Sequence, residues 1–183
     1  MKNISKVLVA LTLSMTLSAA IADDAEPVRA GRWEFSAMGQ YSSGDQVEHS
    51  YSPGFILGYN FNDHWNLNLN GSVGLVDAKV DGVKGEGSIY TAALNVDYHF
   101  LTGKVTPFVS AGVGIFNWDA KENFSGPSAF SVVGTGVSYS GAVGVRWEMC
   151  PRTFLRAAYR GTGTSLSGVS FMNGAEISLG WKF

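Results

Sequence analysis

The chain ends with Gly174-Ala175-Glu176-Ile177-Ser178-Leu179-Gly180-Trp181-Lys182-Phe183, a run in which apolar and polar side chains alternate. Successive side chains of a β-strand point to opposite faces, so the odd-numbered residues of this run share one face. That face is apolar and aromatic, and the opposite face is polar and charged. The run therefore predicts a strand with one apolar face, and it stops on an aromatic residue with no polar tail after it.

The same alternation recurs seven more times along the chain. A helix would scatter Asn66, Asn68 and Asn70 around its circumference, whereas in a strand they share one face. Short connections alternate with long ones, as is typical of a bacterial outer-membrane barrel with an even number of strands. We expect strands at 33–41, 55–61, 65–75, 90–100, 107–116, 137–148, 153–161 and 174–183, tight turns at 62–64, 101–104 and 149–152, and long loops at 42–53, 76–87, 117–136 and 162–172.

The two faces of these strands differ in charge. The aromatic face contains no Asp, Glu, Lys or Arg, and the charged residues lie on the opposite face. An Arg or Lys that faces lipid at mid-bilayer costs about 2–4 kcal/mol, so an uncharged face favours contact with lipid. A soluble barrel would need a wet surface built mainly of Gly, Ser, Ala and Asn, which is poor soluble surface. We predict an all-β fold, an eight-stranded antiparallel transmembrane up-and-down β-barrel over residues 32–183.

Residues 1–22 have the features of a secretory signal peptide. Lys2 and Lys6 precede an apolar run over 7–17, and small residues lead to Ala22. We expect cleavage after Ala22 and a short periplasmic lead over 23–31. No later segment offers the roughly 20 apolar residues that a spanning helix needs. The formal net charge of −2 gives no electrostatic footprint for nucleic acid.

Aromatic residues gather near the ends of the expected strands, on the uncharged face. Amphipathic rings at such positions lie between lipid tails and headgroups and form a girdle. The expected girdle residues are Trp33, Tyr41, Tyr59, Trp65, Tyr98, Trp147, Trp181 and Phe183.

The ending Ile177-Ser178-Leu179-Gly180-Trp181-Lys182-Phe183, the segment TPFVSAGVG over 106–114 and the signal peptide carry a family resemblance. The chain resembles the small outer-membrane barrels of the opacity-protein, OmpA-transmembrane-domain and OmpW-like group. The resemblance implies residence in the cell outer membrane, contact with its lipid and lipopolysaccharide, and insertion by the outer-membrane assembly machinery. It implies no cofactor. The assembly signal would be Ile177, Leu179, Trp181 and Phe183.

Charged side chains on the inward face are expected to pair inside the narrow barrel. Buried charges are tolerated when they are paired, and four acids stand here against four bases. Side chains roughly fill the interior of an eight-stranded barrel, so the charges predict a salt-bridged plug, with a conducting filter as the alternative. The expected lumen network is Glu34, Asp97, His99, Arg146, Glu148, Arg156, Arg160, Glu176 and Lys182.

A structural or surface-interaction role is the favoured function. The longest expected loop, 117–136, carries Trp118, Phe124 and Phe130. Loops on rigid scaffolds commonly carry binding function, so these aromatic residues suit contact with an extracellular ligand or a host surface. They would equally suit packing on the barrel mouth. The alternative function is a channel for small solutes or hydrophobic compounds.

A lipid-modifying enzyme is the third class of function. His49 and Ser50 are the adjacent base and nucleophile in the chain, but adjacent residues of an extended chain point in opposite directions. His64 and His99 have no second ligand at a useful spacing, so no metal site is expected. The sequence therefore predicts no catalytic residues.

Overall fold

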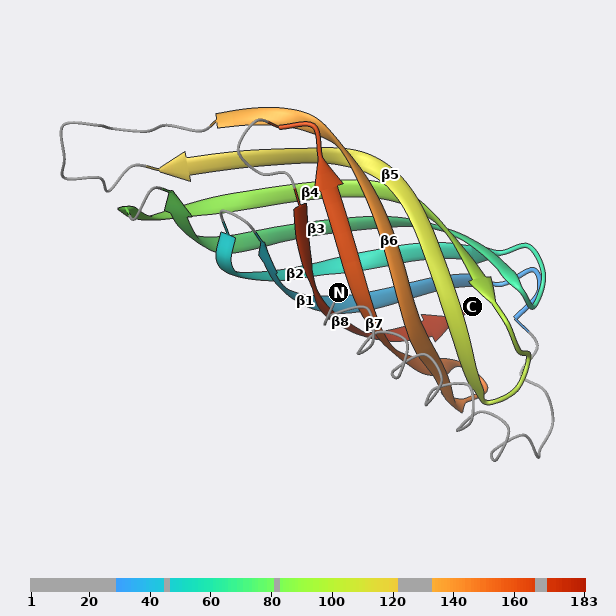
Figure 1. The fold of residues 1–183 in the computed structure, drawn as a ribbon. Coiled ribbons are helices and arrows are strands. Elements are labelled where there is room, and N and C mark those ends of the chain that lie inside the picture. Colours follow the sequence, from blue (N-terminus) through green and yellow to red (C-terminus); the bar gives the residue numbers. More distant parts are fainter. Residues whose placement is uncertain (1–28, 45–46, 81–82, 122–132, 167–170) are drawn as a thin grey trace, which may run out of the picture.

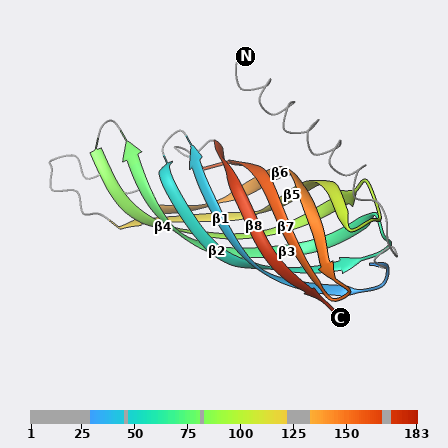
Figure 2. The same cartoon turned by 90° about the horizontal axis from the view of Figure 1, so that it is seen from below.

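Eight antiparallel strands follow one another around a closed barrel, which confirms the predicted fold class (Figures 1 and 2). The computed structural model describes residues 29–44, 47–80, 83–121, 133–166 and 171–183. The expected signal peptide over 1–22 and most of the expected lead lie outside these residues. In the described part of the chain, no helix is long and apolar enough to cross a membrane. The strands are β1 (Trp33–Gly44), β2 (Val47–Asn60), β3 (Trp65–Val80), β4 (Val83–His99), β5 (Val105–Lys121), β6 (Val133–Cys150), β7 (Thr153–Thr164) and β8 (Phe171–Lys182).

The barrel closes where the last strand meets the first. β1 and β8 pair from Glu34–Lys182 to Gly44–Met172. The backbone N–H of Trp33 donates to the carbonyl of Phe183 at 3.1 Å, and the N–H of Phe183 donates back at 3.0 Å. Backbone polar groups in lipid must be satisfied within the protein, which a closed ladder achieves. The terminal residue therefore contributes directly to closure.

The strands extend farther at the loop end than the alternation predicted. The expected long loops over 42–53 and 76–87 are wrong, because the flanking strands take up all of them except 45–46 and 81–82. Those over 117–136 and 162–172 are wrong at their edges, because the ladders continue into them. Asp77 and Glu86 are outward-facing partners in the β3–β4 ladder. Polar outward residues end the apolar alternation, while the backbone hydrogen bonds that define a strand continue. β5 and β6 consequently reach beyond β7 and β8 at this end (Figure 1).

The outward and inward faces of the barrel differ sharply. Outward side chains such as Leu69, Leu94 and Val113 are exposed and apolar. The inward face carries asparagine, serine and the charged residues, nearly all of them buried. An apolar outside and a polar interior are the pattern of a membrane barrel.

Two phenylalanines fill the interior near the turn end by using glycines on neighbouring strands. Phe108 is the cross-strand partner of Gly144, and Phe154 is the partner of Gly180. A Cβ atom at Gly144 would lie 2.8 Å from Cε1 of Phe108, and one at Gly180 would overlap the ring of Phe154. Glycine at these two positions leaves the space that each ring occupies.

A charge on the outward face should cost stability according to its depth. Val143 and Val137 both point outward from β6, with Val143 near the middle of the strand and Val137 toward the loop end. Val143→Arg should lower the free energy of unfolding by about 2–4 kcal/mol, and Val137→Arg by about 1 kcal/mol or less. Reversible unfolding in lipid vesicles measures both. Equal losses would mean that depth in a bilayer does not determine the cost.

Deleting Phe183 removes one backbone pair with Trp33 and the last ring of the outward face. We expect outer-membrane levels of the folded barrel to fall sharply, because closure between β1 and β8 is incomplete. Heat-modifiable mobility on gels and membrane fractionation measure this, with Phe183→Trp as the conservative control. Undiminished levels of folded protein in the deletion would contradict the expectation.

Candidate functional site

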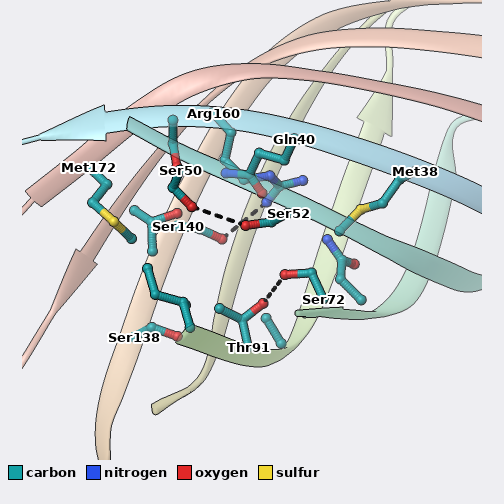
Figure 3. Close-up of a pocket in the computed structure, with 15 residues that line it drawn as sticks. Met38, Gln40, Ser50, Ser52, Ser72, Thr91, Ser138, Ser140, Arg160 and Met172 are labelled. Carbon is teal, nitrogen blue, oxygen red and sulfur yellow. Dashed lines mark hydrogen bonds between the residues drawn. The ribbon is translucent and has the colours of Figure 1, made fainter. Parts of the chain in front are cut away.

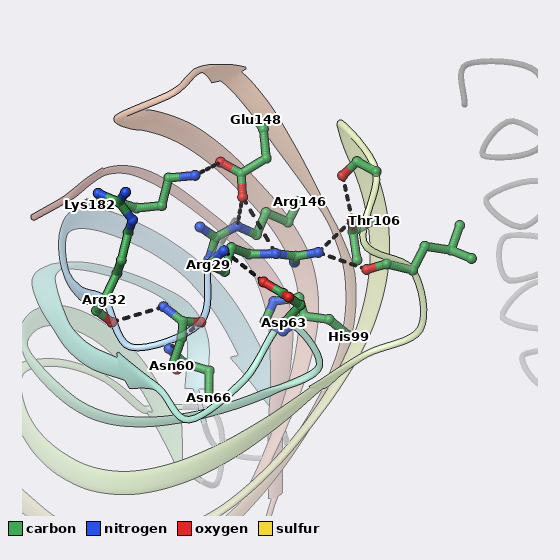
Figure 4. Close-up of polar contacts among 12 residues, drawn as sticks. Arg29, Arg32, Asn60, Asp63, Asn66, His99, Thr106, Arg146, Glu148 and Lys182 are labelled. Carbon is green, nitrogen blue, oxygen red and sulfur yellow. Dashed lines mark hydrogen bonds and ion pairs between the residues drawn. The ribbon is translucent and has the colours of Figure 1, made fainter. Parts of the chain in front are cut away.

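Arg146 of β6 is the centre of a buried ion-pair cluster at the turn end of the lumen (Figure 4). Its guanidinium donates to Glu34 through Nη1 at 2.8 Å and Nη2 at 2.6 Å, and to Glu148 through Nε at 2.7 Å. The carbon of the guanidinium lies 3.6 Å from the ring centroid of Phe154. Arg146 is 0% exposed, so the two carboxylates and the ring replace the water it has lost.

Two further strand-borne cations also pair with carboxylates in the lumen, Lys182 within this cluster and Arg156 in a separate pair. Nζ of Lys182 lies 2.9 Å from Oε2 of Glu148, so Glu148 joins β6 to β8 across the interior. Nη2 of Arg156 lies 2.8 Å from Oδ2 of Asp97. The guanidinium of Arg156 also lies 4.5 Å from the ring centroid of Phe108. Each of these strand-borne cations therefore faces a carboxylate.

A third ion-pair group lies farther from the turn end. Nε of Arg160 donates to Oε2 of Glu176 at 2.7 Å. Nη1 of the same guanidinium lies 3.2 Å from Oδ1 of Asn95 and 3.2 Å from Oγ of Ser140. The nine inward residues of the expected network are thus all buried, and eight of them form three ion-pair groups.

The ninth residue, His99, is buried but makes no ion pair among the described residues. Its ring centroid lies 5.7 Å from that of Phe108, and neither ring nitrogen has a hydrogen-bond partner in the described part of the chain. Its backbone carbonyl contacts Nδ1 of His64 at 2.7 Å. His99 packs against the cluster instead of extending it.

Arg29 is a member of the cluster that the sequence did not identify. It belongs to the segment expected to be a short periplasmic lead, yet its side chain is 0% exposed and enters the barrel (Figure 4). Its Nη2 donates to the carbonyl of Leu101 at 2.7 Å and contacts Oγ1 of Thr106 at 3.4 Å. Nε lies 3.9 Å from Glu148, and neither Nε nor Nη1 has a hydrogen-bond partner among the described residues. Arg29 lies before the first strand, so no alternation pattern could reveal it.

The surroundings of Arg29 disfavour its positive charge. Burial lowers its pKa from its ordinary value to about 10, with a further contribution from the positive charge of Arg146. Such a shift corresponds to about 3 kcal/mol against the charged form. Arg29 is therefore less well compensated than the strand-borne cations.

Asp63, in the turn between β2 and β3, holds the backbone of the same segment. Its Oδ1 accepts from the N–H of Arg29 at 2.7 Å and from the N–H of Ala30 at 3.1 Å. Partial burial alone would raise the pKa of Asp63, but these two donors outweigh it and lower the pKa. Stability from this carboxylate is present above its ordinary pKa and is lost as the pH falls through the lowered value.

A polar cavity lies beyond Arg160, between the ion pairs and the loop end (Figure 3). Hydroxyl groups line much of it, with Ser72 contacting Thr91 at 2.7 Å and Ser50 contacting Ser52 at 3.2 Å. The volume open to the centre of a water molecule is about 50 Å³. One water needs roughly 10–15 Å³ on this measure, so the cavity is sized for a few waters and not for an organic solute.

An apolar cluster fills the loop end of the lumen. The prediction that Trp118 is a surface-loop contact is wrong, because it lies in β5, faces inward and is 3% exposed. The long β5–β6 ladder carries this ring into the interior instead of onto a loop. Leu166 packs against the cluster, and Cδ2 of Leu166 would lie 2.8 Å from a Cβ atom at Gly134. Phe124 and Phe130 lie outside the described residues. The cluster consists of Val47, Val76, Ile89, Phe116, Trp118 and Met172.

The expected girdle residues lie on the outward face, and most gather at the turn end. Trp33 contacts Tyr59 with ring centroids 5.1 Å apart, and Trp65 contacts Tyr98 at 4.8 Å, so both tyrosines are half-buried. Tyr41 lies at the opposite end of β1. Exposed aromatic side chains at the turn end also include Trp147, Trp181 and Phe183, and the outward face of β8 carries Ile177 and Leu179.

His49 and Ser50 point to opposite sides of β2. His49 is exposed and its Nδ1 contacts the hydroxyl of Tyr41 at 2.8 Å, while Ser50 is buried in the lumen. This base and this hydroxyl therefore do not face one another. Among the described residues, no three His, Cys, Asp or Glu side chains are grouped so that they could hold a metal ion.

The closed barrel, its apolar outside and its polar lumen define an integral membrane β-barrel. The chain belongs to the outer membrane protein beta-barrel domain family, whose model matches residues 7–183, and it is accordingly a protein of the outer membrane. None of the curated protein sequences compared with this chain matches it.

Solved structures of small outer-membrane barrels share the fold. OprG from Pseudomonas aeruginosa superposes with a TM-score of 0.62 at 17% identity, covering 87% of this chain and 99% of that one. The N-terminal β-barrel domain of OprF from Pseudomonas aeruginosa gives 0.58 at 21%, covering 84% and 98%. Ail, the attachment invasion locus protein of Yersinia pestis, gives 0.58 at 15%, covering 84% and 99%. Likeness at these identities establishes the fold alone.

Replacing Arg146 should strongly destabilise the barrel. Arg146→Ala leaves Glu34 without its bidentate partner and weakens the pairing of Glu148, and breaking a buried pair costs about 3–5 kcal/mol. Arg152→Ala, at an exposed turn position, is the control and should change stability by no more than about 0.5 kcal/mol. Unfolding in lipid vesicles measures both variants. A loss for Arg146→Ala as small as that of the control would contradict the assignment of Arg146 as the centre.

Proposed function

We propose that this protein is a structural or surface-interaction barrel of the outer membrane whose lumen is closed by its own side chains. The observation that carries the proposal is the ion-pair cluster of Arg146 with Glu34 and Glu148 at the turn end. An ion pair of this kind holds two strands together across the interior and occupies the path that a solute would take. Closure, in this proposal, is a property of the folded barrel and needs no separate plug domain.

The loop end of the lumen supports the same proposal. The apolar cluster around Phe116 and Trp118 fills the interior above the polar cavity. An ion that crossed the barrel would have to leave water at this cluster, which is costly for a charge. In this proposal the lumen has one closure of paired charges and one of apolar side chains, with a small polar cavity between them.

Surface interaction is the activity that the long strands support best. β5 and β6 extend a rigid ladder beyond the ends of β7 and β8 on the loop side. Binding residues are commonly presented on a rigid scaffold in this way. One structural neighbour, Ail, is named an attachment invasion locus protein and has been crystallised with a heparin analogue. An extracellular ligand or a host surface is the class of partner we propose here, together with lipopolysaccharide at the outward face.

A channel for small solutes or hydrophobic compounds is the second candidate function. The polar cavity lined by Ser52, Ser72 and Thr91 favours it, because a space with hydroxyl groups on its walls already exists inside the barrel. For conduction, both the ion-pair cluster and the apolar cluster would have to rearrange. Catalysis has less support, because His49 and Ser50 lie on opposite faces of β2.

Conductance in planar bilayers tests the closed lumen. The wild-type barrel should show only small or rare conductance steps. Arg156→Ala removes the cation beside Asp97, whose carboxylate is buried, so this variant should be less stable, leakier, or both. Large and steady channels from the wild-type protein would contradict the proposal and favour the solute channel.

A further inference from the structure

The residues that precede β1 form a strap across the turn end of the barrel. We define the N-terminal strap as residues 29–32. Its backbone binds one side of the mouth, where Asp63 accepts from Arg29 and Ala30 and where the N–H of Gly31 donates to the carbonyl of Asn60 at 2.8 Å. Gly31 has a φ of +73°, a conformation that favours glycine and that turns the chain over the rim.

The side chain of Arg29 continues the strap to the other side of the mouth. Its Nη2 reaches the carbonyl of Leu101 and the hydroxyl of Thr106, in the β4–β5 connection and the start of β5 (Figure 4). Contacts on the β2–β3 turn and on the β4–β5 side are thus joined by a single residue. The guanidinium of Arg29 therefore lies across the turn end of the lumen and covers the interior there.

Charge balance separates Arg29 from the cations of the strands. The described lumen carboxylates are Glu34, Asp97, Glu148 and Glu176, and each faces Arg146, Arg156, Lys182 or Arg160 within 2.9 Å. Arg29 is a fifth cation, and its nearest described carboxylate contact is 3.9 Å, to Glu148. Withdrawing Arg29 therefore leaves every one of these carboxylates paired. Withdrawing Arg146, Arg156 or Arg160 would instead leave Glu34, Asp97 or Glu176 without its cation.

We propose that the N-terminal strap is a detachable cover over the turn end of the lumen, held by Asp63 and inserted through Arg29. The strap closes the outer layer of the interior, which includes Thr106, while the ion pairs of the strands stay intact beneath it. The barrel thus has two arrangements at this end, one with the strap seated and one with the strap released. This inference goes beyond the closed lumen proposed above, since the strap can detach whether or not the barrel conducts.

The proposal has a direct test in the accessibility of position 106. Thr106 is 0% exposed beneath Arg29, and Cys150, the free thiol of the described chain, is exposed. The parent for labelling carries Thr106→Cys with Cys150→Ser in the full chain, refolded into vesicles. A charged, membrane-impermeant maleimide then reports how often the strap leaves the introduced thiol uncovered.

Two variants release the strap by different routes, and a third serves as the matched control. Arg29→Ala removes the inserted group, and Asp63→Ala removes the holding carboxylate without changing a residue that contacts the label. Arg32→Ala changes an exposed arginine of the same strap. We expect labelling at least about tenfold faster than the parent in the first two variants and unchanged in the control.

Labelling within twofold of the parent in both Arg29→Ala and Asp63→Ala would overturn the proposal. An equal increase of the labelling rate in Arg32→Ala would also overturn it, because the rate would then not depend on the contacts that Arg29 makes. Heat-modifiable mobility identifies any variant that has lost its fold, and in that case the other releasing variant decides. Because the wild-type conductance is measured separately, failure of the strap and failure of the closed lumen give different results.

Discussion

The buried ion pairs of Arg146 with Glu34 and Glu148 are the interaction on which the interior of this barrel depends. A narrow lumen cannot solvate an isolated charge, and removing one partner of a buried pair leaves the other uncompensated. Glu148 also pairs with Lys182 of β8. The next residue, Phe183, exchanges backbone hydrogen bonds with Trp33 where the barrel closes. The ion pairs in the lumen and the backbone pairing of β1 with β8 therefore both stabilise the turn end of the barrel.

The inward side chains form three layers along the barrel axis. Paired charges lie at the turn end, a polar cavity lies beyond Arg160, and an apolar cluster that includes Trp118 lies at the loop end. In the closed lumen that we propose, the charges would occupy the path of a solute and the apolar cluster would disfavour ions. The proposed role therefore lies on the outward and loop surfaces of the barrel and not in transport through its centre.

The sequence was sufficient for the fold because period-2 alternation is read directly from residues such as Asn66, Asn68 and Asn70. The same alternation placed Arg146 and Glu34 on the inward face. It could not locate the strand ends, since outward residues such as Asp77 are polar there while the ladder continues. Arg29 was missed for a different reason. Its burial depends on a tertiary contact with Asp63 that has no signature in local pattern.

A double-mutant cycle between Glu34 and Arg146 measures directly whether this buried pair stabilises the interior of the barrel. Glu34→Gln, Arg146→Met and the double variant would be unfolded reversibly in lipid vesicles, and the coupling free energy obtained from the four stabilities. Residues in one buried network couple, so we expect about 1–3 kcal/mol of favourable interaction between these two side chains. Additive effects, with coupling below about 0.5 kcal/mol, would contradict the view that this pair holds the interior together.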